Sequence, residues 1–367
     1  MKVLVAPDAF SGTLSAPEAA RAITAGWQRT SPDDALVAMP MSDGGPGFTQ
    51  TVHAVLGGEV DVLTVPDLAR RAAPVTVLRS GRAAYVEAAE ATGRQLAAAA
   101  DPWRSTSVGV GRAVDAAVSS GASTVVVGLG GTATLDGGAG LLAGLGATAD
   151  VPLDQGPRSL RGIGRIDLEP VLDRLEGVRL VAAVDVDLPL LGMFGTTRAT
   201  GADLGLDDGD VVEVDGVLDA WVDVLCGPSP SQRRVADAKG AGAGGGQALA
   251  LALLGAELRP GVELVGDVVG LDAACAAHDL VVSGEGRYDH TSRAGKVVHG
   301  VAACAAARAR PCIVLAGEVT VGSREMRAMG VESAYGTVDL LGRDRALLDP
   351  AAALADLAER VARTWAR

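Results

Sequence analysis

Positive charge is scarce in this sequence. Its 367 residues include 45 acidic and 32 basic side chains, which gives a formal net charge of −13. A nucleic-acid-binding surface needs clustered Lys and Arg to replace the counterions of the phosphates. The composition therefore argues against nucleic acid as a partner, and any phosphate or carboxylate ligand must be held by local donors.

Cysteines and long apolar runs are also scarce. The four cysteines, at positions 226, 275, 304 and 312, have no C-x-x-C spacing, so we expect reduced, buried thiols in a cytoplasmic protein. No apolar run reaches membrane-spanning length. The first residues, "MKVLVAPDAF", are not expected to be a signal peptide, because their apolar stretch breaks at Pro7 and Asp8. These absences predict a soluble protein without a membrane partner.

Apolar residues are abundant, although few of them are aromatic. They make up 48% of the chain, and only 3% of the residues are aromatic, so Ala, Val and Leu must form the cores. The length favours two domains. Short continuous apolar runs lie at 3–7, 124–131, 179–186, 279–286 and 312–319. Such runs are typical of strands that are buried on both faces of a parallel sheet.

Helical patterns follow most of these runs, which predicts an α/β architecture. Ser15 and Glu18 fit a capping box at the start of the first helix. The further expected segments are a helix over 138–147, long connections over 150–170 and 199–216, a glycine loop with a helix over 239–257, and a helix over 296–310.

Polar and glycine-rich residues follow the predicted strands, where open α/β sheets bind their ligands. They are Asp8, the segments 42–47, 128–140, 283–289 and 316–318, and the pair Asp185 and Asp187. Glycines allow close backbone approach to a ligand, and amides at a helix start bind phosphate without a positive side chain. Several acids beside such loops suggest a phosphate ligand with a divalent metal.

These features have structural alternatives. Residues 128–133 have the spacing of a dinucleotide fingerprint, but a convincing acid about 20 residues further on is lacking. An NAD-dependent dehydrogenase is therefore a weak hypothesis. Asp8 and Asp43 are equally compatible with turn caps. Arg287 lies between Glu285 and Asp289, where a local ion pair is the simpler interpretation.

Lys296 favours a functional interpretation. Lysine occurs only at positions 2, 239 and 296. Lys296 stands at the start of a predicted helix, where the helix dipole favours anions. A phosphate bound at that terminus would explain a cation in this place.

Seven segments, in this order, resemble the motifs of the bacterial glycerate kinase family, which is typified by an N-terminal "APDSFKGSLSA". They are "VAPDAFSGTLSA" (5–16), "SDGGPG" (42–47), "GLGGTATLDGGAG" (128–140), "AAVDVDLPL" (182–190), "GAGAGGG" (240–246), "LLGAELRPGVEL" (253–264) and "SGEGRYDHTSRAGKVVHGVA" (283–302). Each motif is weak alone, but together they are spread over most of the chain, from residue 5 to residue 302.

The resemblance implies two α/β domains. One is flavodoxin-like or Rossmann-like with a parallel sheet, is built from both chain ends, and is expected over 1–66 and 280–367. The other is inserted in it, over 67–279. The resemblance also implies transfer of the ATP γ-phosphoryl group to a hydroxyl of D-glycerate or a similar small hydroxy acid, with Mg²⁺.

The same resemblance assigns site residues by motif position. Asp185 is expected as the base or metal-orienting carboxylate, and Lys296 as the second catalytic residue. The expected substrate-binding residues are Asp8, Ser11, Asp43, Gly44, Gly45, Arg287 and Asp289. The expected nucleotide-binding residues are Gly128, Gly130, Gly131, Thr132, Asp136, Gly137, Gly138 and Glu285. No residue is assigned to the metal, and the oligomeric state stays open.

Several polar motif positions depart from the family pattern. Ser11 replaces a lysine, Pro46 an acid, Leu135 an asparagine and Leu188 another asparagine. The glycines and apolar runs that preserve the fold are retained, whereas these changes alter the site. An alternative interpretation is therefore a diverged, non-catalytic paralogue that keeps the fold and binds a ligand.

Overall fold

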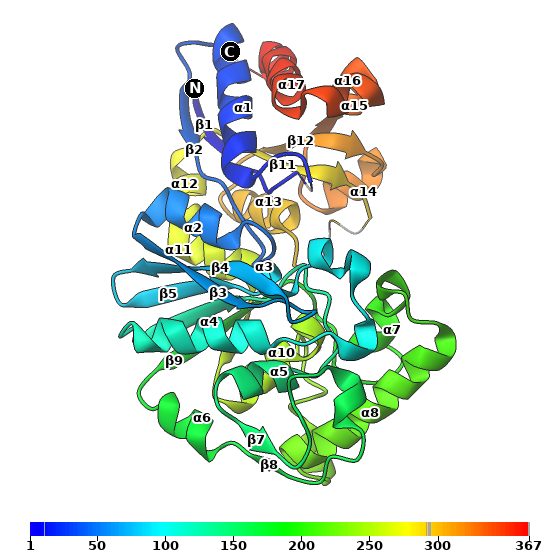
Figure 1. Ribbon diagram of the computed structural model, residues 1–367. Helices are drawn as coiled ribbons and strands as arrows, with labels where there is room; N and C mark the ends of the chain where they lie inside the picture. The colour runs from blue at the N-terminus through cyan, green and yellow to red at the C-terminus, as the bar shows by residue number, and fades with distance from the viewer. Residues whose placement is uncertain (11, 291, 293–294, 366–367) are drawn as a thin grey trace. The chain divides into compact units, whose positions relative to one another are not determined.

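The computed structural model describes residues 1–10, 12–290, 292 and 295–365. The protein divides into two compact units (Figure 1). The first unit comprises Met1–Asp43, Gln50–Gly57 and Val262–Arg367, and the second comprises Gly44–Thr49 and Gly58–Gly261. The domain borders expected from the sequence, after residues 66 and 279, stay a prediction.

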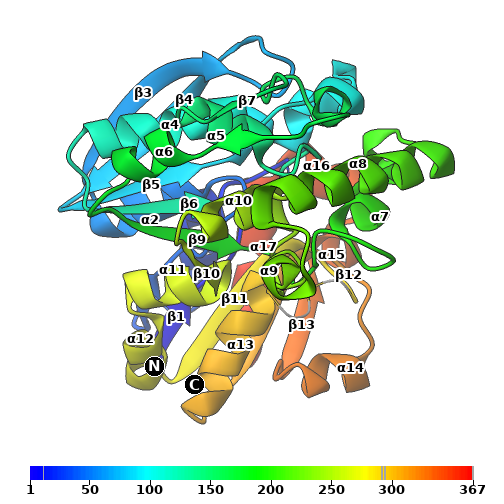
Figure 2. The ribbon, with the colours of Figure 1, turned by 90° about the horizontal axis from the view of Figure 1, so that it is seen from below.

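The first unit contains a five-stranded sheet in the order β13-β12-β11-β1-β2, and every neighbouring pair is parallel. Its strands are β1 (Lys2–Val5), β2 (Ala35–Ala38), β11 (Leu280–Tyr288), β12 (Cys312–Val319) and β13 (Ser333–Gly336) (Figure 2). Counted along this unit, the order is 2-1-3-4-5, which is the flavodoxin-like arrangement. The α/β prediction is confirmed, and β1 and β11 flank the point where the strand order reverses.

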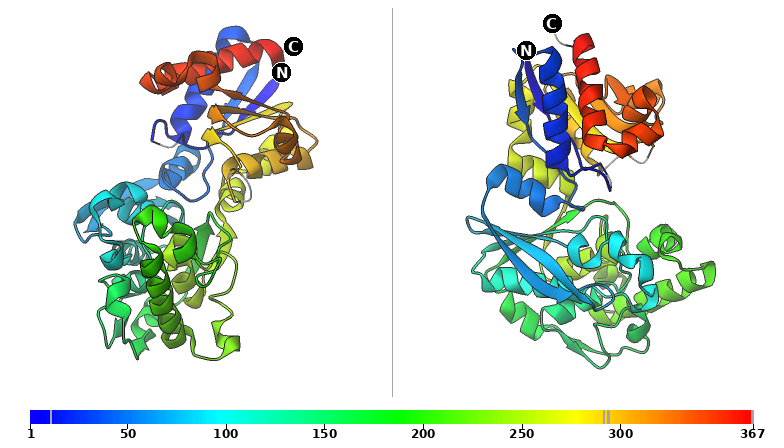
Figure 3. Two further views of the ribbon diagram at one scale, coloured as in Figure 1. Left: turned by 90° about the vertical axis from the view of Figure 1, so that its right-hand side faces the viewer. Right: turned by 45° about the horizontal axis from the view of Figure 1, so that its top comes forward.

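Helices cover both faces of this sheet. They are α1 (Ala16–Thr30), α11 (Gly261–Val269), α12 (Leu271–Ala277), α13 (Val297–Ala307), α14 (Ser323–Ala328), α15 (Thr337–Leu341), α16 (Arg343–Leu348) and α17 (Pro350–Trp365). The longest two, α1 and α17, lie side by side on one face (Figure 3), and α13 packs on β11 and β12. Alternate strand residues such as Val5, Val282 and Ile313 join α1 and α17 in one buried core.

Helix α1 shows why its sequence folds as predicted. The Ser15 side chain accepts a hydrogen bond from the amide of Glu18, and the Glu18 carboxylate accepts one from the amide of Ser15. This capping box satisfies amides that the helix itself leaves free. Ile23 and Trp27, one turn apart, are fully buried, and the Trp27 indole N–H donates to Asp34 at 3.0 Å.

The second unit contains a six-stranded sheet in the order β10-β9-β6-β5-β4-β3. The strands are β3 (Glu59–Pro66), β4 (Ala72–Ser80), β5 (Ala83–Glu87), β6 (Thr124–Gly128), β9 (Arg179–Val184) and β10 (Glu257–Pro260). The pairs from β5 to β10 are parallel, whereas β3, β4 and β5 pair antiparallel. A separate short pair joins β7 (Thr148–Ala149) and β8 (Ile166–Asp167).

Helices connect most of these strands. The α-helices are α3 (Ala89–Thr92), α4 (Val108–Ser119), α5 (Ala139–Gly144), α6 (Glu169–Arg174), α7 (Thr196–Thr200), α8 (Asp208–Cys226), α9 (Pro230–Arg233) and α10 (Gln247–Leu253). The 3₁₀ segments are Arg94–Ala99, Pro102–Arg104, Pro157–Leu160, Ala202–Leu204 and Ala243–Gly245. Helix α2 (Phe48–Leu56) carries the chain from the second unit back into the first.

One expected connection is wrong. Residues 199–216 were expected to be a loop, but α8 begins at Asp208. Asp207 and Asp210 form a capping box, which offsets the poor helix propensity of the Asp and Gly residues that follow. Val214, Leu218 and Trp221 then recur at helical spacing and are fully buried, so packing stabilises the helix.

None of the helices in the described ranges is both long and apolar enough to cross a membrane.

Candidate active site

In the first unit, the predicted acids gather where the strand order reverses. The chain leaves β1 through Asp8, whose amide donates to the carbonyl of Gly284 on β11 at 2.8 Å. Glu285 follows directly on β11, and both side chains are half-buried. Ligands of open α/β sheets bind at this position, beyond the carboxyl ends of the strands. The fold therefore brings together two residues that lie far apart in the sequence.

Negative charge accumulates around Asp8. Burial raises the pKa of Asp8 well above its usual range, and the neighbouring carboxylates of Asp43 and Glu285 raise it further. The carboxylate also accepts a hydrogen bond from the amide of Ala9 at 2.7 Å, which favours the charged form. Asp8 thus lies among acids in a poorly solvated place, where a bound cation would be stabilised.

Glu285 has a similar environment. Burial raises its pKa to about 7, while the Ser292 hydroxyl and the charge of Lys296 favour the ionised form. Its Oε1 atom is buried and has no hydrogen-bond partner within the described ranges. A buried carboxylate oxygen without a partner is costly unless a ligand or ion completes its bonding.

Lys296 lies at the N-cap position of α13, as the sequence predicted. Its Nζ atom donates to Asp43 Oδ2 at 2.8 Å, and the Asp43 side chain is buried. The helix dipole disfavours a positive charge at the start of α13, and the carboxylate of Asp43 offsets this by pairing with Lys296. About a third of the Lys296 side chain, 35%, stays exposed, so the ammonium group remains within reach of a ligand.

Arg287 lies at the end of β11 and is mostly exposed, with 62% of its side chain accessible. Its Nε atom lies 3.3 Å from Asp289 and 4.0 Å from Glu318 on β12, so the expected local ion pair is present. The buried Ser292 accepts a hydrogen bond from the amide of Asp289. Sequence reasoning had selected Glu318 only as a strand end, and its pairing with Arg287 follows from the parallel register of β11 and β12. It had given Ser292 no role, because only contacts within the loop place this residue there.

In the second unit, the predicted glycines converge on Asp185. The amide of Gly130 donates to the carbonyl of Gly44 at 3.1 Å. A Cβ atom added to Gly130 would lie 2.7 Å from the Cα of Gly45 and 3.3 Å from the Cγ of Asp185. Gly44, Gly45, Gly130 and Asp185 thus meet at the carboxyl ends of β6 and β9, and only a residue without Cβ fits at Gly130.

Asp136 lies at the other end of the glycine segment and is fully buried. Its carboxylate accepts hydrogen bonds from the amides of Ser107, Gly138 and Gly140 and from the Ser107 hydroxyl. Burial raises its pKa, and these donors oppose the shift. Asp136 binds the amides of Gly138 and Gly140 at the start of α5, so these amides are already used. Gly131 and Thr132 are half-exposed and are the part of the 128–140 segment that a ligand can reach more easily.

Glu87 is a buried acid that sequence reasoning missed. It ends β5, and its carboxylate accepts hydrogen bonds from the amides of Gly47 and Thr49, the residues on either side of the first residue of α2. Burial and the charge of Glu90 raise its pKa to about 7. The sequence signal was a Glu directly after an apolar run. In the structure, the carboxylate binds backbone amides at the start of α2, which is a structural role.

The remaining candidates are distributed as follows. Asp185 belongs to the second unit and Lys296 to the first. Ser11 lies outside the described residues. Gly128 and Gly137 are buried against the side chains of Phe48 and Trp221, respectively.

The fold defines an α/β protein whose charged residues gather at the carboxyl ends of parallel strands, the usual ligand-binding place of this class. A family model described as the glycerate kinase family matches residues 3–366. The chain belongs to the glycerate kinase family, which confirms the resemblance seen in its motifs.

Individual relatives agree with this assignment. The chain is 35% identical over 351 residues to the glycerate 2-kinase of Escherichia coli K12, covering 93% of this chain and 92% of the relative. It is 37% identical over 369 residues to an uncharacterized protein of Mycobacterium bovis, covering 99% of this chain and 91% of the relative. A crystal structure of a Salmonella typhimurium LT2 protein provisionally named glycerate kinase 2 matches with a TM-score of 0.81 and 32% identity, covering 99% of this chain and 98% of that one.

Proposed function

We propose that the protein is an ATP-dependent kinase that transfers the γ-phosphoryl group to a hydroxyl of D-glycerate or a similar small hydroxy acid. The observation that carries the proposal is the charged cluster of Asp8, Asp43, Glu285 and Lys296 at the switch point of the first sheet. Family membership, with relatives named glycerate kinase, supports the same chemistry. The four cysteines are unpaired, which supports our placing the enzyme in the cytoplasm.

Phosphoryl transfer requires positioning and charge neutralisation more than covalent help from the protein. Lys296, held by Asp43, would provide a fixed point charge for the transferring phosphoryl group. Arg287 would bind a carboxylate or phosphate through its planar fork, since most of its side chain is exposed. Asp8, Asp43 and Asp289 would shape this part of the site.

Asp185 is the carboxylate that we assign to the acceptor hydroxyl. It is half-buried and lies beside Gly45 and Gly130. Because these residues have no side chain, the backbone comes close to the carboxylate of Asp185. From this place it would accept or orient the proton of the hydroxyl that is phosphorylated. Gly131 and Thr132 remain our proposed phosphate contacts in the second unit.

Mg²⁺ fits the cluster in the first unit. Mg²⁺ is usually held by one or two carboxylates together with substrate phosphates. Glu285 supplies the buried Oε1, which has no hydrogen-bond partner among the described residues, and Asp8 lies among other carboxylates. When bound, the cation would neutralise charge on the phosphates. No set of three or more His, Cys, Asp or Glu side chains among the described residues could enclose a metal ion by itself.

The test is a coupled assay of ADP release with Mg-ATP and a panel of small hydroxy acids that includes D-glycerate. Turnover with one of these acceptors, and loss of turnover when Mg²⁺ is chelated, is the expected result. Absence of turnover with every acceptor contradicts the proposal. Calorimetric titration with ATP then distinguishes the alternative, a non-catalytic ligand-binding paralogue, from a protein without a nucleotide site.

The positions that depart from the family pattern are relevant to this alternative. Leu135 is buried in the hydrophobic core of the second unit. The ring of Pro46 lies where a Cβ atom on Gly131 would meet it, at 2.7 Å. At least Leu135 therefore stabilises the fold, and its apolar side chain does not by itself argue for a lost activity.

A further inference from the structure

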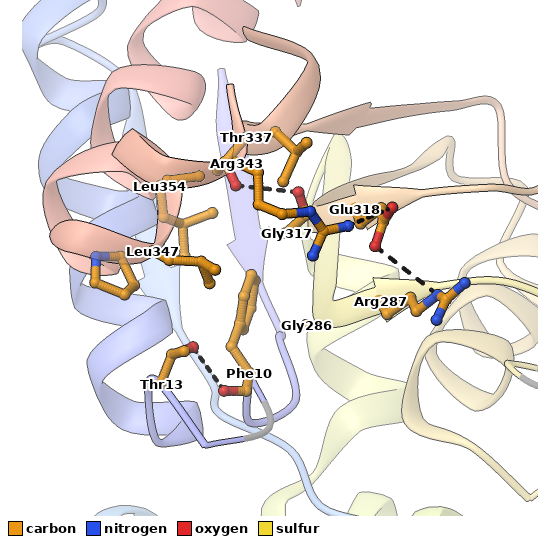
Figure 4. A pocket seen from close by; sticks show the side chains of 13 residues that line it. Phe10, Thr13, Gly286, Arg287, Gly317, Glu318, Thr337, Arg343, Leu347 and Leu354 are labelled. Atoms are coloured by element: carbon orange, nitrogen blue, oxygen red, sulfur yellow. Dashed lines mark hydrogen bonds and ion pairs between the residues drawn. The ribbon is translucent and has the colours of Figure 1, made fainter. Parts of the chain in front are cut away.

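A cavity of about 200 Å³ lies in the first unit at the carboxyl ends of β11 and β12 (Figure 4). Gly286 and Arg287 line it from β11, and Gly317 and Glu318 line it from β12. The loop after β1 and the helices α15 to α17 close the other sides. Of the residues given a role above, Arg287 alone lines this cavity.

The cavity has two chemically different ends (Figure 4). At one end lie the apolar side chains of Phe10, Leu347 and Leu354. At the other end, Arg343 donates to Glu318 at 2.9 Å, and Arg287 lies 4.0 Å from the same carboxylate. Arg287 also lies 3.3 Å from Asp289, so two carboxylates balance the two guanidinium groups. Both Arg side chains are mostly exposed, 62% for Arg287 and 61% for Arg343, so their remaining N–H groups can reach an anionic group. This combination suits a ligand with a flat apolar part and an anionic part.

The dimensions restrict the ligand further. Pockets that enclose a whole drug-sized molecule measure roughly 300–1,000 Å³. A cavity of about 200 Å³ therefore holds a ring system and leaves the rest of the ligand outside. A small hydroxy acid has no apolar ring that would benefit from Phe10 and Leu347.

The charged end of the cavity shares Arg287 with the candidate active site. Glu285 directly precedes Gly286 and Arg287 on β11, and Arg287 pairs with Asp289. A ligand whose ring occupies the apolar end can therefore place an anionic group at Arg287, next to the candidate active site. A nucleoside triphosphate has this shape.

We propose that this cavity binds the base and ribose of the nucleoside triphosphate, with the base between Phe10, Leu347 and Leu354 and the phosphates towards Arg287 and Arg343. The inference rests on the proposed kinase function. It adds the place where the phosphoryl donor, the nucleoside triphosphate, binds. It assigns the base to the first unit, whereas the nucleotide-binding residues expected from the sequence, apart from Glu285, lie on the glycine segment of the second unit.

Leu347 and its neighbour Leu348 provide a matched pair for the test. Leu347 lines the cavity and is 56% exposed, whereas Leu348 lies outside the lining and is 85% exposed. Both can be replaced by Gln, which is neutral and similar in size. Leu347→Gln should raise the Kd of ATP about tenfold, as expected for losing the burial of one apolar side chain against the base. Leu348→Gln should bind ATP as the wild type does.

Calorimetry with ATP and with inorganic tripolyphosphate separates the base from the phosphates. Leu347→Gln should leave the Kd of tripolyphosphate and the KM of the acceptor unchanged. Equal ATP affinity in Leu347→Gln and wild type, an equal loss in Leu348→Gln, or a change confined to the acceptor KM would overturn the inference. If Leu347→Gln does not fold, as judged by its thermal transition, Val338→Gln on α15 replaces it, because Val338 also lines the cavity.

Failure of the two proposals is distinguishable. If the wild type binds ATP and the Leu347→Gln effect appears, but no acceptor is phosphorylated, the kinase proposal fails and the nucleotide site stands. If the wild type phosphorylates an acceptor and Leu347→Gln has no effect on ATP binding, the kinase proposal stands and the nucleotide site fails. A wild type that does not bind ATP overturns both.

Discussion

The Nζ atom of Lys296 lies 2.8 Å from Oδ2 of Asp43, although 253 positions separate the two residues in the sequence. Both belong to the first unit, and their pair lies beside Asp8 and Glu285. A buried carboxylate and a half-exposed ammonium group thus hold each other in place at the end of the parallel sheet. Removing either partner takes away the opposite charge that lies 2.8 Å from the other.

Lys296→Met should lower kcat by roughly 10²–10³, the range for removing one group that stabilises transition-state charge. Steady-state kinetics at saturating Mg-ATP measure this. The control is Lys239→Met, because Lys239 is 84% exposed and its ammonium group lies 3.8 Å from Asp187. Retained kcat in Lys296→Met, or an equal loss in Lys239→Met, would contradict the assigned role.

Asp185→Asn should lower kcat by about 10²–10⁴ while changing the acceptor KM little, because general-base groups act in the transition state. Asp187→Asn provides the matched control, since Asp187 lies two residues further on and its side chain is 65% exposed. We expect the control to retain wild-type kcat. If both variants keep full activity, Asp185 is not the base.

Glu87→Gln should change how stability depends on pH. The folded-state pKa of Glu87 is raised from its ordinary value of 4.5 to about 7, so the folded protein favours the protonated form. Its contribution to stability is fully present below pH 4.5 and is lost as the pH rises through about 7. The loss amounts to at most about 3 kcal/mol, at 1.36 kcal/mol for each pKa unit.

Gln is neutral at every pH and keeps an acceptor oxygen for the amides of Gly47 and Thr49. Glu87→Gln should therefore be more stable than the wild type at pH 8 and similar to it at pH 4.5. Urea unfolding at both pH values measures this difference. Glu59→Gln, at an exposed position on the edge strand β3, is the control for replacing a Glu by Gln elsewhere in the same unit. Parallel pH profiles for Glu87→Gln and wild type would refute the assignment.

Gly130→Ala should destabilise the second unit by about 1–3 kcal/mol, the usual cost of overpacking. The new Cβ would lie 2.7 Å from the Cα of Gly45, which is backbone and cannot rotate away. Gly216→Ala is the opposite case: the position is exposed within α8, and a Cβ there has no neighbour within 4 Å. It should stabilise the protein by up to about 1 kcal/mol. The free energy of unfolding is measured with a denaturant. If both variants are more stable, or both less stable, than the wild type, this packing is contradicted.

Much of the first unit follows from local sequence patterns. Continuous apolar runs predicted β1, β11 and β12, and the Ser15–Glu18 capping box predicted where α1 begins. The antiparallel strands β3 and β4 were not predicted, because β3 is an edge strand with exposed residues and has no continuous apolar run. Helix α8 was missed because its first residues, rich in Asp and Gly, resemble a loop until packing is considered.

The sequence alone determined the α/β class, the family and the residues that carry charge at the strand ends, because buried strands and glycine turns leave local signatures. Only the tertiary structure decided which of those residues meet. Lys296 and Asp43 are brought together by the order of strands in the first sheet, and Asp136 is turned inward by the packing of α4 and α5. Such contacts join residues far apart in the sequence, and no local pattern encodes them.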